Sequence, residues 1–265
     1  MMNDANEISH HTKLYGFIGE EAGQSSFCAT LNRKFKANNK DAMMIPMNVR
    51  EDDFFFTASN MKKSHLNGAV ISYEYVEKVV EILDESPELV RRSGMCDILI
   101  RDGEKLVGDV FFIRVLTAFL KDNLVSNIAL IGVSPYAKVL SFFSCGFNIS
   151  YFNDDLEALM HLTQETDVLD ADINRIATGM SIDFSQFDAV LDFSNLLNLD
   201  MIEKFAKINI DMKHKKQFSS LKNRANELGA NYRGFDDLLE EYSQGAYNFF
   251  EKKGDLKDDK SAMKF

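Results

Sequence analysis

The chain has 265 residues and a formal net charge of −11, with 45% hydrophobic and 11% aromatic residues. This is enough for one large or two modest domains with real cores. An acidic chain lacks the positive surface that non-specific nucleic-acid binding needs, and no apolar run is long enough to span a membrane, so neither partner is expected.

Alternating strands and helices are predicted in the first half of the chain. Strands are expected at Leu14–Gly19, Met43–Val49 and Ala69–Tyr73, followed by a hairpin whose arms, Asp97–Arg101 and Lys105–Val107, flank Asp102-Gly103. Pro46 suits an edge strand better than a central one. Helices are expected at Gln24–Ala37, Asp52–Lys63, Tyr75–Leu83 and Phe111–Leu120.

The second half continues the alternation, which predicts a parallel sheet covered by helices. Its strands are expected at Asn127–Gly132, Asn148–Phe152, Phe187–Asp192 and Lys207–Asp211. Its helices are expected at Pro135–Cys145, Asp155–Thr163, Leu199–Ala206, Phe218–Leu228 and Phe235–Phe250.

The cysteines and the termini indicate the compartment. Cys28, Cys96 and Cys145 are widely spaced and form no CxxC, which is typical of reduced thiols in a cytoplasmic protein. The N-terminal segment has no signal-peptide core. Residues 1–12 and 253–265 are polar and are expected to be flexible tails.

Two segments carry a family resemblance. Ile18–Asn32 is similar to the pattern IGxPxxHSxSPxxHN, and Val70–Val76 is similar to NVTxPHK. Ser25 matches the first serine of the first pattern, and Ser72 replaces the threonine of the second. Because the register holds without gaps from Ser25 through Phe112, the chain resembles the shikimate/quinate dehydrogenase family.

The resemblance implies an α/β fold with two domains, an N-terminal mixed α/β substrate-type domain and a C-terminal Rossmann-like parallel sheet. The predicted substrate domain comprises residues 13–108 plus 235–252, and the predicted dinucleotide-type domain comprises 109–234. A small-molecule ligand is expected in the cleft between them, and a homodimer is left open as a partner.

The resemblance also implies substrate contacts at Ser25, Ser72, Asp97 and Gln244, the last within a segment similar to the family's QxAxxF helix. Phe27 stands where the second serine of the carboxylate clamp belongs and cannot donate a hydrogen bond. Val76 and Phe112 stand at the catalytic lysine and aspartate. Neither can exchange a proton, so no catalytic residue is assigned.

For a dinucleotide, the resemblance points to Gly132, Ser134, Asn153 and Asp154. Gly132 alone survives from the GxGGxxR turn, and Ser134-Pro135 predicts a capped helix start. Asp154 or Asp155 would repel a 2′-phosphate, so NAD is expected over NADP if a dinucleotide binds, although both aspartates could simply cap a helix. The family's NATPxG-like loop is replaced by Asp192–Leu197.

Two functional hypotheses follow. The first is a shikimate-dehydrogenase-like protein that lacks the usual activity and acts as a ligand-binding, regulatory or scaffold protein. The alternative is a NAD(P)-dependent oxidoreductase acting on a shikimate- or quinate-related or less anionic substrate, with Tyr73 or Tyr75 carrying the proton. The histidines show no metal-ligand spacing, so no metal is expected. Whether the chain is an enzyme stays open.

Overall fold

The computed structural model describes residues 11–143 and 146–254. The described chain divides into two compact units, which we call unit 1 (11–91, 95–111 and 240–254) and unit 2 (92–94 and 112–239). Each unit has its own five-stranded sheet, mixed in unit 1 and parallel in unit 2, which confirms the predicted fold class. Most of the predicted tails, and Cys145, lie outside the described residues.

Unit 1 is built on the strand order β2-β1-β3-β4-β5. The first three strands are parallel to one another, and the last two form an antiparallel hairpin. Pro46 lies on β2 at the edge of this sheet, as predicted. The elements are β1 (Lys13–Gly19), α1 (Phe27–Ala37), β2 (Ala42–Asn48), α2 (Phe54–Asn60), β3 (Leu66–Ile71), α3 (Glu88–Ser93), β4 (Ile98–Asp102), β5 (Lys105–Asp109) and α8 (Leu239–Gly254).

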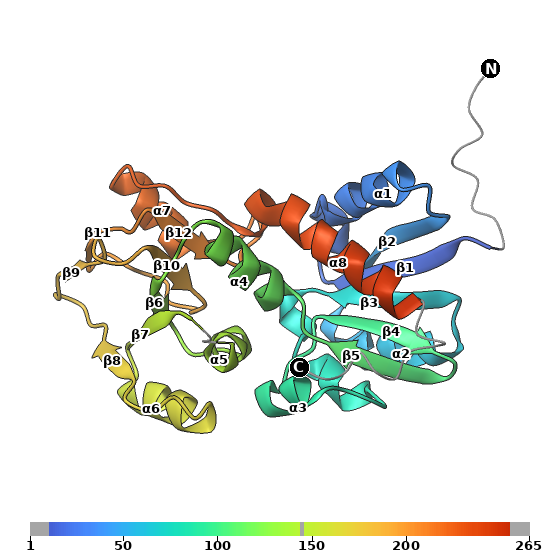
Figure 1. Cartoon of the computed structure of the whole chain (residues 1–265), viewed down its shortest axis with the longest axis horizontal. Coiled ribbons are helices and arrows are strands. Elements are labelled where there is room, and N and C mark those ends of the chain that lie inside the picture. The colour runs from blue at the N-terminus through green and yellow to red at the C-terminus, as the bar shows by residue number, and fades with distance from the viewer. Residues whose placement is uncertain (1–10, 144–145, 255–265) are drawn as a thin grey trace, which may run out of the picture. The chain divides into compact units, whose positions relative to one another are not determined.

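Helix α8 crosses one face of this sheet (Figure 1). Its Phe250 stacks on Tyr15 of β1, with ring centroids 4.0 Å apart, and Phe35 of α1 stacks on the same tyrosine at 5.7 Å. All three rings are buried. The C-terminal helix and the first helix therefore share one aromatic core with β1.

Unit 2 has the strand order β12-β10-β6-β7-β8, with every pair parallel. The chain runs outward from β6 to β8 and then returns to the other side of β6, which creates a topological switch point between β6 and β10. The elements are α4 (Phe112–Asp122), β6 (Asn127–Ile131), α5 (Pro135–Phe142), β7 (Asn148–Asn153), α6 (Leu156–Glu165), β8 (Asp172–Arg175), β9 (Ile182–Asp183), β10 (Ala189–Asp192), β11 (Ile202–Lys204), β12 (Ile208–Asp211) and α7 (Ser220–Glu227).

The predicted helix Leu199–Ala206 is wrong. In its place β11 pairs with β9 in a separate two-stranded sheet. Leu199 and Ile202 are buried and three residues apart, which imitated a helical period, but both fill the core of unit 2 from an extended segment. Arg224 of α7 fixes this segment because its Nε donates to the C=O of Ile202 at 2.8 Å.

The predicted helix Tyr75–Leu83 forms only short 3-10 turns, at Tyr73–Tyr75 and Lys78–Ile82. Its β-branched residues at 76, 79, 80 and 82 disfavour a longer α-helix. Strands β8, β9 and β11 and helix α3 were not predicted. Each is short, and only one of the four residues of β8 is apolar.

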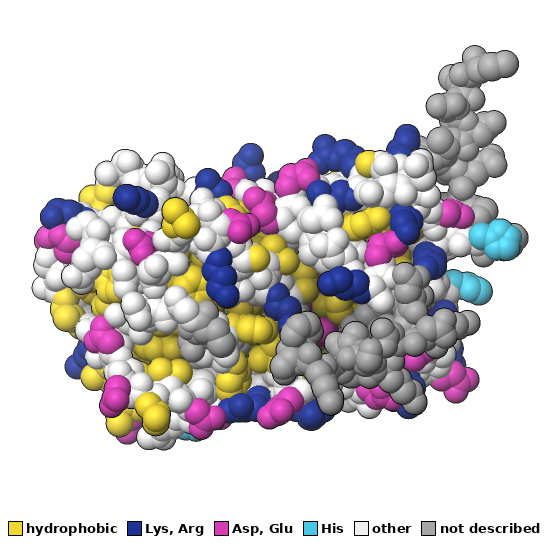
Figure 2. Space-filling view, in the orientation of Figure 1, with side chains coloured by type: hydrophobic (Ala, Val, Ile, Leu, Met, Phe, Trp, Pro, Cys, Tyr) yellow, Lys and Arg dark blue, Asp and Glu magenta, His cyan; other side chains and the backbone are white. Residues whose placement is uncertain are grey.

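The surface mixes both signs of charge. Basic and acidic side chains are interspersed over the face shown in Figure 2. Within the described ranges, no helix has the length and apolar character needed to cross a membrane.

Candidate functional site

The carboxyl ends of β1 and β3 lie at one edge of the sheet in unit 1, because Ile18 pairs with Ile71 in parallel register. Ser72 directly follows β3. The N–H of Ile71 donates to the C=O of Asp97 at 2.9 Å, which places Asp97 at the same edge. Ser25 follows β1 beyond a 3-10 turn. Three of the four predicted substrate contacts therefore come from segments at this edge.

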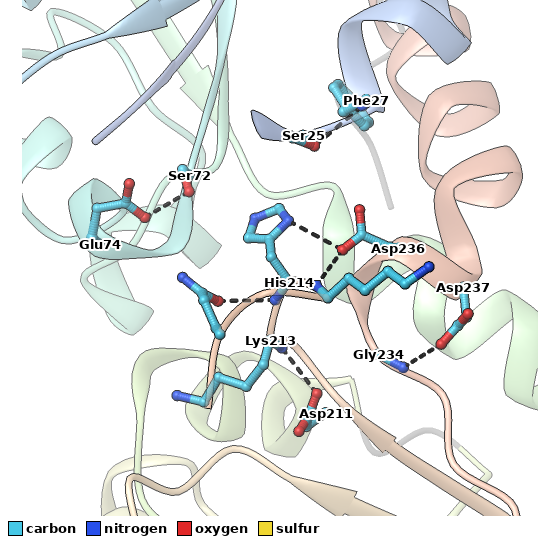
Figure 3. Close-up of polar contacts among 12 residues, drawn as sticks. Ser25, Phe27, Ser72, Glu74, Asp211, Lys213, His214, Gly234, Asp236 and Asp237 are labelled. Carbon is cyan, nitrogen blue, oxygen red and sulfur yellow. Dashed lines mark hydrogen bonds and ion pairs between the residues drawn. The ribbon is translucent and has the colours of Figure 1, made fainter. Parts of the chain in front are cut away.

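The hydroxyl of Ser72 is already bonded within unit 1. It donates to Oε2 of Glu74 at 2.6 Å (Figure 3), and Oε1 of the same carboxylate accepts from the N–H of Glu20 at 2.7 Å. A Cβ on Gly19 would lie 2.7 Å from Cβ of Ser72 and 2.8 Å from Oε1 of Glu74, so a larger residue would displace this pair. The Ser72 hydroxyl is therefore already used by Glu74, and the negative charge of Glu74 would repel a substrate carboxylate.

Ser25 and Phe27 cannot form the family's two-serine clamp. The N–H of Phe27 donates to Oγ of Ser25 at 3.1 Å (Figure 3). The Phe27 ring is fully buried and packs against Phe17 of β1, with ring centroids 5.2 Å apart. The position of the second serine has thus become part of the hydrophobic core of unit 1.

The other two predicted substrate contacts are also engaged in local bonds. Asp97 is fully buried, and its Oδ1 accepts from the N–H of Phe111 at 2.7 Å, which fixes the segment that follows β5. Gln244 is exposed on α8 and donates to Oδ1 of Asn248 at 2.9 Å. These bonds give Asp97 a structural role.

Val76 is buried, with 2% of its surface exposed, and its C=O accepts from the N–H of Cys96 at 2.8 Å. It is a core residue of unit 1. The neighbouring Tyr75 is buried as well, and its hydroxyl donates to the C=O of Val49 at 2.7 Å. Burial, together with the nearby Glu20 carboxylate, raises the pKa of Tyr75 to about 12, which is poorly matched to proton transfer near neutral pH. Tyr73 is 39% exposed.

Phe112 begins α4 in unit 2 and is also only 2% exposed. Its ring packs edge to face against Phe235, with centroids 5.1 Å apart and an interplanar angle of 77°. The position that holds the family's aspartate is therefore an apolar packing position within unit 2.

Gly132 follows β6 at the switch point and has a φ of +96°, a conformation that favours glycine. A Cβ there would lie 2.6 Å from the N, Cα and Cβ atoms of Ser194, which follows β10. The space beside Gly132 is thus filled by this chain's own backbone. Close packing of the two loops explains why a glycine is needed here, without any phosphate.

Two hydrogen-bond donors are lost at the start of α5. Ser134 caps the helix by accepting from the N–H of Ala137 at 3.3 Å, and Pro135 has no N–H. Tyr136 is buried against Phe193, with ring centroids 6.1 Å apart. A pyrophosphate binds through free N–H groups and close backbone approach. The residues of this turn do not fit that group.

The three predicted polar residues at the end of β7 make different contacts. Asp155 caps α6 by accepting from the N–H of Ala158 at 3.1 Å, as the capping interpretation predicted. Asn153 is buried and donates to the C=O of Asp155 at 3.2 Å. Asp154 is exposed and lines a groove in unit 2. Of the three, Asp154 alone lines this groove, and its Oδ1 accepts from the N–H of Asp155 at 3.1 Å.

The groove has a volume of about 800 Å³ and lies beyond the carboxyl ends of β7, β8 and β10. Arg175, the last residue of β8, pairs with Asn153 in parallel register and is exposed in the groove beside β7. Ile176 and Met201 supply apolar lining, and Asn195 supplies a polar side chain. The volume lies within the range of small-molecule sites.

Two carboxylates lie buried at the ends of neighbouring strands. Asp192 of β10 and Asp211 of β12 are register partners, 5% and 1% exposed. Oδ1 of Asp192 accepts from the Ser194 hydroxyl at 2.6 Å, and Oδ1 of Asp211 accepts from the Tyr232 hydroxyl at 2.8 Å. Burial raises the pKa of Asp192 to about 6 and also raises the pKa of Asp211.

A histidine–aspartate pair lies in the loops of unit 2. Nδ1 of His214, which follows β12, is 3.7 Å from Oδ2 of Asp236 (Figure 3). The His214 ring packs on Phe235 at 4.4 Å, and the N–H of Lys215 donates to the same carboxylate at 2.5 Å. The neighbouring His214 side chain lowers the pKa of Asp236. A carboxylate beside one imidazole nitrogen is the arrangement that orients a proton-transferring histidine.

Neither this pair nor Arg175 was predicted as part of a site. His214 stands three residues after the end of a correctly predicted parallel strand, which is a signal that could have found it. The described cysteines Cys28 and Cys96 are buried, and burial raises the pKa of Cys28 to about 12. Among the described residues, no cluster of metal-ligating side chains is present.

Several curated sequences are similar to the chain, although no family model matches it. The shikimate dehydrogenase (NADP(+)) of Pyrococcus furiosus is 25% identical over 218 residues, which cover 74% of this chain and 79% of that protein. The shikimate dehydrogenase (NADP(+)) of Clostridium perfringens is 33% identical over 93 residues, covering 35% of this chain and 34% of that protein. Some of the curated matches thus span only about a third of the relative's length.

Solved structures share the whole fold. A shikimate dehydrogenase in complex with NADP+ has a TM-score of 0.72 at 16% identity, over 94% of this chain and 92% of that one. The 5-ketofructose reductase of Gluconobacter sp. strain CHM43 has a TM-score of 0.69 at 16% identity, over 93% and 94%. The chain is thus similar in sequence to a shikimate dehydrogenase over most of its length, and it shares the fold of solved shikimate dehydrogenases.

Proposed function

We propose that this chain is a ligand-binding member of the family that does not carry out the family's dehydrogenation of shikimate or quinate. The observation that carries the proposal is the burial of Val76 and Phe112, at 2% exposure each, inside the cores of their own units. Apolar side chains at both positions cannot act as the family's acid/base pair. Because both side chains are buried, the packing around them leaves no room for another acid or base.

Contacts at the carboxyl edges of the two sheets support the same proposal. Glu74 holds the Ser72 hydroxyl, so the edge in unit 1 disfavours a carboxylate. Ser194 fills the space beside Gly132, so the turn in unit 2 disfavours a pyrophosphate. A ligand-binding role needs a bound small molecule but no hydride transfer.

A steady-state assay with shikimate or quinate, and with NAD or NADP, tests the proposal. The expected result is a turnover indistinguishable from the buffer control. A matched control is the double variant Val76→Lys, Phe112→Asp, for which no activity is expected either, because both positions are packed. A wild-type turnover near about one per second, which is ordinary for an enzyme, would overturn the proposal.

A second candidate is a NAD(P)-dependent oxidoreductase acting on a shikimate- or quinate-related or less anionic substrate. The curated relatives are named as NADP enzymes, which supports a nicotinamide cofactor, whereas the exposed Asp154 favours NAD over NADP. The observation that favours this candidate is the His214–Asp236 pair, a better-placed proton carrier than the buried Tyr75. Calorimetry with NAD and NADP at millimolar concentration separates the two candidates, since the second requires binding.

A further inference from the structure

We propose that Asp192 and the loop after β10 (residues 193–197) form a pH-sensitive latch, in which ionisation of the buried carboxyl group frees the loop from the turn at Gly132. The inference goes beyond the proposed function, because it concerns a conformational change and requires no ligand. All of the residues that carry it belong to unit 2.

Two carboxyl groups occupy neighbouring positions at the ends of β10 and β12. Asp192 and Asp211 are partners in the parallel register, so their side chains leave the same face of the sheet. Both side chains are buried. Like charges this close in a buried site disfavour the state in which both groups are ionised. One of the two is therefore expected to keep its proton to a higher pH than an aspartate on the surface.

The hydrogen bonds of the two carboxyl groups differ. Asp211 accepts three bonds, spread over both of its oxygens, from the hydroxyls of Ser219 and Tyr232 and the N–H of Lys213. Among the described residues, the donors to Asp192 come from Ser194 alone, its N–H at 2.9 Å and its hydroxyl at 2.6 Å, and both serve Oδ1. The charge of Asp192 is therefore less well compensated, and burial raises its pKa to about 6, with Asp211 adding to the rise.

The other groups around the pair do not compensate the second charge. Lys213 is the cation that acts on both carboxyl groups, and it lowers the pKa of each. Burial raises the pKa of Tyr232, with Asp211 and Asp237 contributing, so this hydroxyl stays protonated. The pair faces Ile131 from β6 and Ser219 from the start of α7, and neither carries a charge. One cation thus stands against two buried carboxyl groups.

The loop after β10 is the part of this cluster that can move, since β10 itself is held by β6 on one side and β12 on the other. The Ser194 hydroxyl donates to Asp192 and accepts from the N–H of Leu196 at 3.2 Å, so it fastens the loop to the carboxyl group. Ser194 also fills the space beside Gly132. A rising pH favours any state in which water reaches the ionised Asp192, and displacement of this loop is the smallest change that admits water.

Amide hydrogen exchange of the full chain, followed by NMR and divided by the intrinsic rate at each pH, tests the inference. The opening equilibrium of residues 193–197 should rise about tenfold between pH 5 and pH 7.5. A carboxyl group whose pKa is about 6 in the closed loop and 3.8 in the open loop produces a rise of this size. Asp192→Asn keeps the shape of the side chain but cannot ionise, so it should remove the rise.

The matched control is Asp188→Asn, at the other end of β10. Asp188 accepts from the N–H groups of Ser126 and Asn127, which lower its pKa, so this variant should keep the tenfold rise at residues 193–197. A carbon-13 NMR titration of the Asp192 carboxyl group in the wild type gives the midpoint without any variant. The inference fails if exchange at residues 193–197 is independent of pH, if Asp192→Asn keeps the rise, or if Asp192 titrates near pH 4. None of these measurements involves turnover, so the proposed function is tested separately by its own assay.

Discussion

The polar side chains at the carboxyl edge of the sheet in unit 1 are engaged in local hydrogen bonds, whereas the corresponding edge in unit 2 keeps a groove of about 800 Å³. In unit 1, Ser72 donates to Glu74 and Phe27 lies in the core. In unit 2, Ser194 fills the switch point, but Asp154 and Arg175 remain exposed farther along the edge. The two edges therefore differ, because polar side chains of unit 1 are engaged in local bonds whereas the edge of unit 2 has an open groove.

The largest expected effect comes from restoring a lysine at position 76. Val76→Lys should lower the free energy of unfolding by about 4 kcal/mol, because it places an unpaired charge in a packed core. Urea unfolding measures this loss, and the isosteric Val76→Thr serves as the control, with a loss of about 1 kcal/mol. A stable Val76→Lys protein would mean that the edge of unit 1 is open after all.

The next effect tests the filled turn of unit 2. Gly132→Ala should cost about 3 kcal/mol, since it combines a positive φ with overlap against Ser194. Gly179 has a φ of +85° but no atoms within 4 Å of a built Cβ, so Gly179→Ala should cost only about 1 kcal/mol of backbone strain. Equal losses in thermal unfolding would show that Ser194 does not occupy the space beside Gly132.

The pH dependence of the free energy of unfolding tests the burial of Asp192. Burial raises the pKa of Asp192 from 3.8 to about 6, so the folded state favours its protonated form. The resulting stability is fully present below pH 4 and is lost as the pH rises through about 6, a change of roughly 3 kcal/mol. Asp192→Asn should therefore gain stability relative to the wild type between pH 4 and 7, as measured by unfolding at each pH.

Asp188 provides the control of opposite sign. Hydrogen bonds from the N–H groups of Asn127 and Ser126 lower its pKa, so its stabilising contribution is present above the unfolded pKa and is lost as the pH falls. Asp188→Asn should lose stability relative to the wild type as the pH rises from 3 to 5. The same direction of change for both variants would contradict the burial of Asp192.

The smallest effect concerns the closed edge of unit 1. Ser72→Ala should cost about 1 kcal/mol, since one oxygen of Glu74 loses a donor while the other keeps the N–H of Glu20. Chemical denaturation measures the loss. An unfolding free energy equal to that of the wild type would show that the Ser72 hydroxyl does not bond to Glu74.

The sequence predicted the α/β class and most long elements because their apolar periodicity is strong. The hairpin at Asp102-Gly103 and the edge position of Pro46 also followed from local chemistry. Short elements such as β8 and β11 escaped prediction, since their pairing depends on distant partners. Arg175 was missed for this reason, because its strand carries almost no periodic signal.

Side-chain roles were predicted less well than positions. The family pattern located Ser72 and Asp97 at one edge. It could not reveal that the Ser72 hydroxyl donates to Glu74, or that Asp97 accepts from the backbone N–H of Phe111. Such contacts depend on which rotamers fill a packed site, and no spacing rule encodes them. The same applies to Gly132, whose requirement for glycine comes from Ser194, some sixty residues later.

Amide NMR titration of the labelled protein with shikimate tests the contrast between the two sheet edges most directly. We expect no shift changes in residues 18–26 and 70–76 at millimolar shikimate, because Glu74 and the buried Phe27 leave no clamp for its carboxylate. Saturable shifts confined to those two segments would contradict the account.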